Sequence, residues 1–188
     1  ALRFIGEQTN EMCMIAIRQN YLALQYVKKQ THELCLEAVK LNGLALQFVK
    51  KRTLERSEGC PDICVEAVKN NGNALMFIEK QTHKICLTAI KKNGMALCFV
   101  IDKTPKICLE AVKQNGNAII YVKDVTYELC EEAVKQNGKV INKILEHNKI
   151  VKCILLNNWR LVGYIRRRNQ TDDIMMTVVR SILHLPLE

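Results

Sequence analysis

One pattern recurs six times along this chain, and it constrains the fold more than any other feature of the sequence. Each copy starts at a cysteine, numbered here as position 0, with alanine at +3, isoleucine or valine at +4 and asparagine at +7. A glycine follows that asparagine in every copy except the first. Self-similarity at a fixed period is typical of a stacked array of repeats. The copies start at Cys13, Cys35, Cys64, Cys86, Cys108 and Cys130, at intervals of 22, 29, 22, 22 and 22 residues.

Each copy predicts two short helices. Apolar residues at −1, 0, +3 and +4 share one face of the first helix, and a threonine at −4 can cap its N-terminus. The Asn-Gly pair ends this helix: we expect the asparagine to bond to the backbone of the turn, rather than to form a row of ligand-binding amides, and the glycine to be left-handed. Apolar residues at +10, +11, +13 and +14 predict the second helix, with the aromatic residue at +13 in the core. The capping threonines are Thr9, Thr31, Thr82, Thr104 and Thr126.

A hairpin of this size cannot bury its own apolar faces, so successive copies must stack. The predicted fold class is therefore all-α, an α-solenoid of stacked two-helix repeats. Six clear repeats, preceded by a half repeat, occupy residues 1–148, with an insertion at residues 54–60. We interpret residues 149–188 as a degenerate repeat and a C-terminal capping helix of the same domain, because terminal repeats depart from the interior pattern.

The repeated pattern CLEAVKxNGxALxFV, carried for example by residues 108–122, resembles a short helical-hairpin repeat domain of unknown function. That domain is abundant in giant DNA viruses and their satellites, and it occurs in some protists and intracellular bacteria. The resemblance covers residues 1–148 clearly. It implies an intracellular repeat protein of viral type, acting as an interaction scaffold in the cytoplasm of a virus-infected host cell. It implies no established activity, catalytic residue or cofactor.

The nine cysteines raise three alternatives: disulfides, a metal site and buried thiols. The six in-phase cysteines fall on the apolar face of successive repeats, where neighbours would lie ~8–10 Å apart. A disulfide needs Cα atoms within ~7 Å, so we expect reduced thiols and a reducing, intracellular setting. Cys60 and Cys64 lie one helical turn apart at the insertion, and a redox or metal role stays open for these two.

Residues with catalytic chemistry do not cluster in the sequence. The four histidines do not recur beside the cysteines or the acidic residues, and the chain has no glycine-rich phosphate loop and no zinc-finger spacing. We therefore predict that the protein is not an enzyme and uses no cofactor. No apolar run reaches the ~18 residues of a membrane span, so no membrane partner is expected.

We expect partner binding at the positions that the repeat leaves variable. On the second helix, positions +9 and +12 share a face and differ from copy to copy. Several of these residues are apolar in the middle repeats, and methionine-rich surfaces often bind partner helices. The alternative is that these side chains pack between neighbouring repeats. The candidate partner-binding residues are Met76, Met95, Cys98 and Ile120.

Positive charge is concentrated near the C-terminus. Residues 1–138 hold 19 basic and 15 acidic groups, a net charge of +4, whereas residues 139–188 hold 9 and 4, a net charge of +5. A lysine or arginine recurs at +5, but a glutamate at +2 offsets it in four copies. The leading prediction is a scaffold for protein partners, with homo-oligomerisation left open. The alternative is a nucleic-acid-binding module that uses the basic residues Arg160, Arg166, Arg167 and Arg168.

Overall fold

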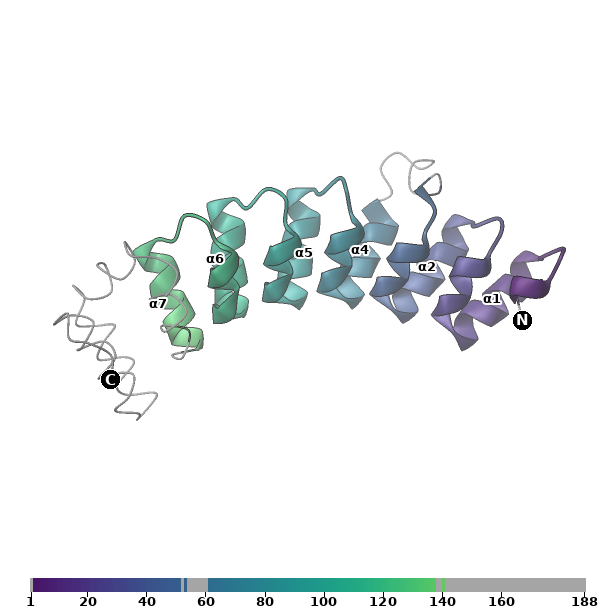
Figure 1. Cartoon of the computed structure of the whole chain (residues 1–188), viewed down its shortest axis with the longest axis horizontal. Helices are drawn as coiled ribbons and strands as arrows, with labels where there is room; N and C mark the ends of the chain where they lie inside the picture. The colour runs from purple at the N-terminus through teal and green to yellow at the C-terminus, as the bar shows by residue number, and fades with distance from the viewer. Residues whose placement is uncertain (1, 52, 54–60, 138–139, 141–188) are drawn as a thin grey trace, which may run out of the picture. The chain divides into compact units, whose positions relative to one another are not determined.

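A computed structural model describes residues 2–51, 53, 61–137 and 140 of this chain, and its regular elements are helices (Figure 1). Within these residues, six α-helices of ten residues alternate with shorter 3-10 helices. The α-helices are α1 (Asn10–Gln19), α2 (His32–Leu41), α4 (Pro61–Asn70), α5 (His83–Lys92), α6 (Pro105–Gln114) and α7 (Tyr127–Gln136). The 3-10 helices are η1 (Leu2–Phe4), η2 (Tyr21–Tyr26), η3 (Gly43–Phe48), η4 (Gly72–Phe77), η5 (Gly94–Phe99) and η6 (Gly116–Tyr121).

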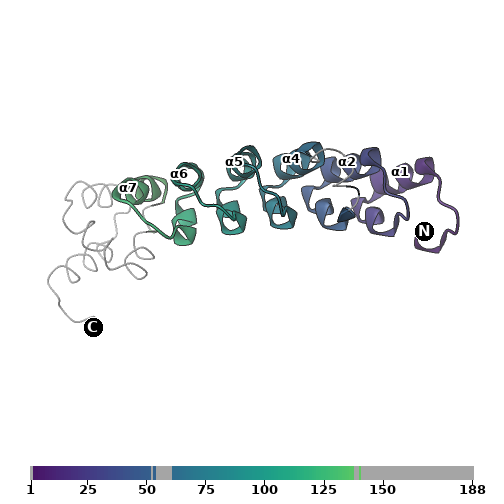
Figure 2. The same cartoon turned by 90° about the horizontal axis from the view of Figure 1, so that it is seen from above.

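The chain divides into two compact units, Ala1–Asp102 and Lys103–Glu188. In the first unit, α1, α2, α4 and α5 each pack against the next, and η2, η3 and η4 each contact the α-helix before and the α-helix after. Figure 2 shows the α-helices of this unit as one row with the 3-10 helices as a second row beside it. In the second unit, α6 packs against α7, and η6 contacts both. This packing of consecutive helices confirms the predicted α-solenoid of two-helix repeats.

Side-chain caps define where each α-helix begins and ends. The threonines at −4 act as predicted: the Thr9 hydroxyl, for example, accepts a hydrogen bond from the Met12 N–H at 3.2 Å. At the other end, the Asn42 N–H donates to the Ala38 carbonyl at 3.0 Å, and Asn42 Oδ1 accepts from the Leu44 N–H at 2.9 Å. The same two bonds recur at every +7 asparagine from Asn20 to Asn115. One asparagine therefore ends the α-helix and begins the 3-10 helix.

The glycine after this asparagine has a different role from the predicted one. None of Gly43, Gly72 and Gly116 adopts the left-handed conformation, so that prediction was wrong. Instead, a Cβ atom on these glycines would lie 2.2, 2.4 and 2.4 Å from the carbonyl oxygen of the +3 alanine in the next repeat. Glycine is thus required because the backbones of successive repeats approach closely there.

The core follows from three residues per turn in the second helix. Position +11 lies in the 3-10 helix, and position +14, one turn later, is its C-cap; both point at the α-helices. In the first unit, both residues are buried for each of η2 to η5. Ala at +10 is also buried in η3, η4 and η5. The prediction of a core aromatic at +13 was wrong: Phe48, Phe77 and Phe99 are half-buried, and Tyr26 and Tyr121 are exposed. The ring at +13 is in the last turn of the 3-10 helix, and it lies beside the side of the helix, carrying +11 and +14, that the α-helices cover.

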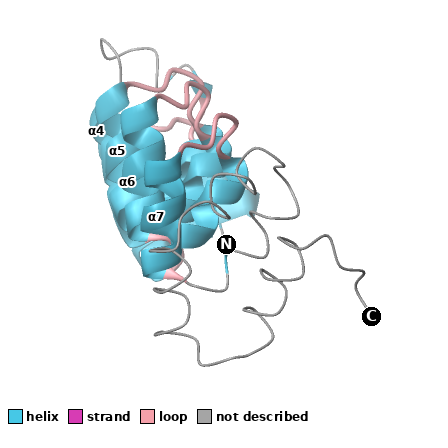
Figure 3. Cartoon of the chain, turned by 90° about the vertical axis from the view of Figure 1, so that its left-hand side faces the viewer, coloured by secondary structure: helices cyan, strands magenta, loops and turns pink. Residues whose placement is uncertain are grey.

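The linkers from each 3-10 helix to the next α-helix run along one edge of the helices, as the pink loops in Figure 3 show. The turns between an α-helix and its own 3-10 helix lie at the opposite end of the hairpin. The first unit therefore presents an outer α-helical layer, a layer of 3-10 helices and a linker edge.

Candidate functional site

A glutamine at position −5 ties neighbouring linkers together, and sequence reasoning missed it. Gln30 Nε2 donates to the carbonyl oxygens of Leu24 (3.1 Å) and Phe48 (2.8 Å), while its Oε1 accepts from the Lys50 N–H at 2.8 Å. One amide therefore joins the last turn of η2 to the end of η3. The clamping glutamines are Gln8, Gln30 and Gln81, and each makes this pair of bonds to the next linker. The sequence signal for this clamp is the glutamine that directly precedes three of the capping threonines.

A second amide contact lies at the other end of two 3-10 helices, η4 and η6. Asn93 Nδ2 donates to Asn73 Oδ1 at 2.7 Å, and Asn137 Nδ2 donates to Asn117 Oδ1 at 3.3 Å. The acceptors are +9 residues, so asparagine at +9 serves the contact between repeats. In the first unit, η4 is thus bonded to the next repeat near both ends, through Asn73 to Asn93 and through the Leu75 carbonyl to Gln81.

The candidate surface is the outer side of the 3-10 helices in the first unit. We call it the η face: the +9, +12 and +13 residues of η2 to η5. These four helices have six residues each, and none of the residues is charged. Several apolar side chains of the η face are open to solvent, led by Met76 at 52% exposure, Tyr26 at 41% and Leu22 at 37%.

All four predicted partner-binding residues lie on the outer side of 3-10 helices. Met76 is on η4, and Met95 and Cys98 are half-buried, one turn apart on η5. In the first unit, η4 packs against η5, so the structure brings these three residues to adjacent helices. Ile120, at 42% exposure, is on η6 of the second unit. The alternative of packing between repeats does not fit the exposure of Met76 and Ile120.

Two glutamines add fixed polar groups to the η face. Gln25 Nε2 donates to the Leu22 carbonyl at 3.0 Å, and Gln47 Nε2 donates to the Leu44 carbonyl at 3.1 Å. Each amide is folded back on its own helix, which limits its freedom. The η face is therefore apolar with a few ordered amides, a composition that can bind another polypeptide without burying a charge.

Five of the six in-phase cysteines are thiols packed in the core, and none of the five forms a disulfide. Cys13, Cys35, Cys86, Cys108 and Cys130 are buried, and the Cys86 thiol donates to Gln81 Oε1 at 3.5 Å. Burial raises the pKa of Cys13, Cys86 and Cys108, and it raises the pKa of Cys130 to about 12. Because the thiolate is the nucleophile and the metal ligand, burial disfavours the reactive form of these last four thiols.

The insertion cysteines and the basic C-terminal residues can be placed only in part. Cys64 is half-buried, while Cys60 lies outside the described residues. No three His, Cys, Asp or Glu side chains gather into a possible metal site within the part of the chain that the structure describes. The residues Arg160, Arg166, Arg167 and Arg168 also lie outside the described residues.

The +5 lysines on the outer α-helices are largely paired. Lys69 Nζ lies 2.5 Å from Glu66 Oε1, and Lys135 Nζ lies 2.8 Å from Glu132 Oε1. Lys113 pairs with Glu110 at 3.8 Å, and Arg18 Nε reaches Glu37 of the next repeat at 2.9 Å. Such pairs cancel most of the field that a phosphate backbone would need.

A family model, described as Domain of unknown function (DUF4116), matches residues 9–54, 60–104, 83–124 and 104–149. The chain belongs to this family. Each DUF4116 match spans two successive copies of the pattern, for example those that begin at Cys13 and Cys35. No curated protein and no solved structure matches the chain. No helix in the described ranges is both long and apolar enough to cross a membrane.

Proposed function

We propose that this chain is a non-enzymatic scaffold that binds a protein partner through the η face. The observation that carries the proposal is the run of four uncharged 3-10 helices that leaves Met76, Tyr26 and Leu22 exposed. In a solenoid, residues that the stacking does not use are free to specify binding. The outer α-helices, by contrast, carry the paired charges of an ordinary solvated surface.

The order of the η face supports the same proposal. The amides of Gln8, Gln30 and Gln81 fix the linkers, and the Asn93–Asn73 contact fixes η4. A surface that is ordered before binding loses little conformational entropy when a partner docks. The exposed methionine adds an adaptable apolar contact. The setting that we propose is the reducing cytoplasm of a virus-infected cell, supported by the free thiols and by the resemblance to repeats of giant viruses.

The test is affinity capture from host cells with a pair of matched variants, followed by mass spectrometry. Met76→Glu places a charge on the η face, and Leu41→Glu places one on an equally exposed apolar residue of α2, outside that face. A protein partner of the η face should be retained by the parent and by Leu41→Glu and lost, by tenfold or more, with Met76→Glu. A partner retained equally by both variants would refute the proposal.

Nucleic-acid binding is the second candidate, and the net charge of +5 over residues 139–188 favours it. Losing phosphate contacts should lower the slope of log K against log salt by about 0.9 per contact on duplex DNA. We expect Arg166→Gln/Arg167→Gln/Arg168→Gln to lower that slope, and Lys69→Gln/Lys91→Gln/Lys113→Gln to leave it unchanged. The reverse result would move the binding surface to the outer α-helices, and no binding by the parent at low salt would remove this candidate.

A further inference from the structure

The linker edge of the first unit carries an excess of lysine beside the η face. The linkers that follow η2, η3 and η4 contain, among their described residues, five lysines and one glutamate: Lys28, Lys29, Lys50, Lys51, Lys80 and Glu79. Two further acidic residues of the described edge, Glu7 and Asp102, lie in the first and last linkers of the unit; outside the described residues, the linker after η3 also contains Glu55 and Glu58, balanced in charge by Arg52 and Arg56. The middle of the edge is therefore positively charged.

Two of these lysines are held in place by the backbone. Lys50 Nζ donates to the carbonyl oxygens of Val27 (3.0 Å) and Lys28 (2.8 Å), and Lys28 Nζ donates to the Gly6 carbonyl at 2.8 Å. Each ammonium thus reaches back to the linker of the preceding repeat. Neutral carbonyls orient these charges without cancelling them, so an ordered pair of cations lies along the edge.

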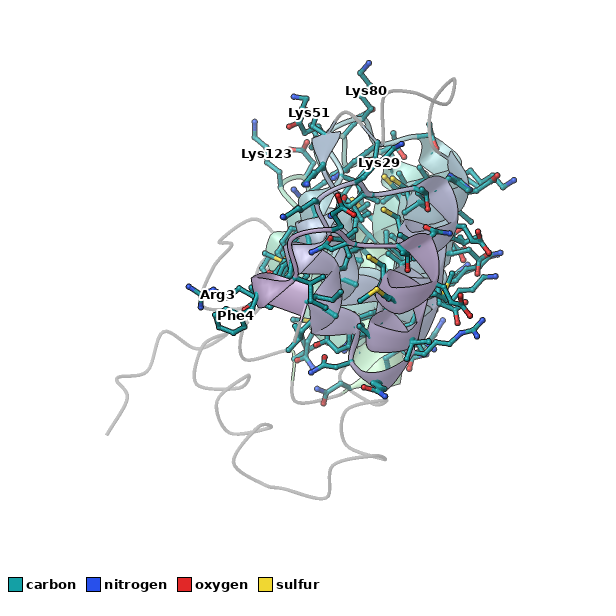
Figure 4. The ribbon with its side chains drawn as sticks, turned by 90° about the vertical axis from the view of Figure 1, so that its right-hand side faces the viewer. Arg3, Phe4, Lys29, Lys51, Lys80 and Lys123 are labelled. Atoms are coloured by element: carbon teal, nitrogen blue, oxygen red, sulfur yellow. The ribbon has the colours of Figure 1, made fainter. Side chains whose placement is uncertain are left out.

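The other three lysines project into solvent. Figure 4, which looks at the first unit from its N-terminal end, shows Lys29, Lys51 and Lys80 on the linker edge and Phe4 on the side of the 3-10 helices. Lys51 pairs with Glu79 at 3.0 Å, and this carboxylate offsets one of the five lysine charges. The edge keeps most of its positive potential.

Connectivity places this charge directly beside the uncharged surface. Each linker begins at the residue that follows its 3-10 helix, so Lys28 and Lys29 come two and three residues after Tyr26 of the η face. The η face therefore has an apolar centre and, along its linker side, a basic border. Stable interfaces share this arrangement, with an apolar core and a polar rim whose charges complement those of the partner.

We infer that the η face binds an amphipathic acidic segment of a partner protein. The apolar side chains of that segment would contact η2 to η5, and its aspartate or glutamate residues would contact the lysines of the linker edge. This inference rests on the proposed function and specifies the chemistry of the partner. A polypeptide fits better than a single-stranded nucleic acid, because the most open apolar side chain of the η face is Met76 and three of its four +13 rings, Phe48, Phe77 and Phe99, are half-buried, which leaves Tyr26 as one exposed ring. Stacking of bases needs open ring faces.

The experiment starts from a displayed library of random 16-residue peptides selected on the whole chain, with the strongest binder remade as a fluorescent probe. Two triple variants give a matched pair with the same change in net charge. Lys29→Glu/Lys51→Glu/Lys80→Glu reverses the linker edge, and Lys40→Glu/Lys69→Glu/Lys91→Glu reverses three exposed lysines of the outer α-helices. Met76→Glu tests the η face itself.

We expect the selected peptides to be enriched in Asp and Glu together with Leu, Ile, Phe or Trp. Probe binding should weaken about tenfold in the linker-edge variant, less than twofold in the α-helix variant, and about tenfold between 50 and 300 mM salt. A probe whose apolar residues are changed to serine should lose binding. If that serine probe binds as well as the parent probe, the attraction is non-specific and the inference falls.

The outcomes separate the inference from the proposed function. If Met76→Glu weakens the probe but the linker-edge variant does not, or if the enriched peptides are not acidic, the partner chemistry is wrong and the proposed function stands. If Met76→Glu has no effect, or if no peptide is enriched, both fall. If instead a single-stranded oligo(dT) binds through the linker lysines and the selected peptide does not displace it, the ligand is a nucleic acid.

Discussion

The first α-helix and the interior α-helices of the same unit carry one sequence pattern but differ in burial. At position −1, Met12 of α1 is 38% exposed, whereas the equivalent Leu34, Ile63 and Ile85 are 1%, 0% and 4% exposed. Ala16 at +3 is half-buried, and its equivalents in α2, α4 and α5 are fully buried. The interior helices are covered by the α-helix of the preceding repeat, and α1 is not covered in this way by any described residue. The burial of an apolar residue therefore depends on whether a neighbouring repeat covers it, and not on the sequence of its own repeat alone.

The first repeat also departs from the pattern where interior repeats need close contact. Ile15 of α1 is 53% exposed at +2, a position that holds glutamate or threonine in the other copies. Tyr21 replaces the glycine that elsewhere lets two backbones meet. The residues that define the repeat are thus the residues of the contact between repeats, and η-face side chains such as Met76 are left for binding.

The largest expected effect comes from overfilling the contact between interior repeats. Ala89→Leu should lower the free energy of unfolding by about 3 kcal/mol, because Ala89 is fully buried on the helix face that meets η4. Ala16→Leu, at the same position of the less covered α1, should cost less than about 1 kcal/mol. Urea unfolding measures both. Equal losses would show that the two positions are equally packed.

Covering α1 should remove its difference from the interior helices. Residues 104–117 occupy repeat positions −4 to +9, and Ala1 occupies position +10. A copy of residues 104–117 placed directly before Ala1 therefore completes one more repeat in frame. The added helix should raise the melting temperature by about 5 °C by covering Met12 and Ile15. The same graft with its copies of Ile107 and Val112 changed to serine is the control. A rise with both grafts, or with neither, would count against the nearest-neighbour explanation.

A smaller effect is expected at the glycine contact. Gly72→Ala would bring a methyl carbon to 2.4 Å from the Ala89 carbonyl oxygen, and the forced shift should cost about 2 kcal/mol. Gly6 has no atom within 4 Å of a built Cβ, so Gly6→Ala should change stability by less than about 1 kcal/mol. Thermal unfolding of the two variants side by side would decide. Destabilisation by Gly6→Ala as large as that by Gly72→Ala would mean that the close approach of two backbones is not the cause.

The smallest destabilisation is expected from the glutamine clamp. Gln30→Ala leaves the Phe48 carbonyl and the Lys50 N–H without their partner and should cost about 1.5 kcal/mol. Gln25→Ala, on the exposed η face, should cost less than about 0.5 kcal/mol. Hydrogen exchange at the Lys50 amide should also be faster in the first variant alone. Unchanged protection at Lys50 would contradict the assigned role.

Periodicity and capping rules predicted the repeat, the helix starts at Thr9 and its equivalents, and the all-α solenoid, because these depend on local chemistry. They did not predict the 3-10 geometry of the second helix, since six residues with small and large apolar groups fit either helix type. The role of Gly43 and the partial exposure of Phe48 could not be predicted either. Both depend on the distance between repeats, which no single copy encodes.

The sequence indicated that two of the candidate residues lie outside the packed core, but it did not indicate the contacts that hold their helices; the binding role of these residues stays a prediction. Met76 and Ile120 are exposed on 3-10 helices, as their position outside the repeat pattern suggested. The clamp by Gln30 bonds residues 18 and 20 positions away, so only the three-dimensional stack reveals it. The lysines of the linker edge went unnoticed because they flank the repeat pattern instead of belonging to it.

The central claim is that the exposed apolar side chains of the η face, such as Met76, take no part in the stacking and are available for a partner. It is tested most directly by measuring the melting temperature and the partner capture of Met76→Glu together. We predict a melting temperature within about 2 °C of the parent, since Met76 is 52% exposed, and loss of partner capture by tenfold or more. A melting temperature lowered as strongly as in Gly72→Ala would show that Met76 belongs to the packing. Full capture at an unchanged melting temperature would show that the partner binds elsewhere.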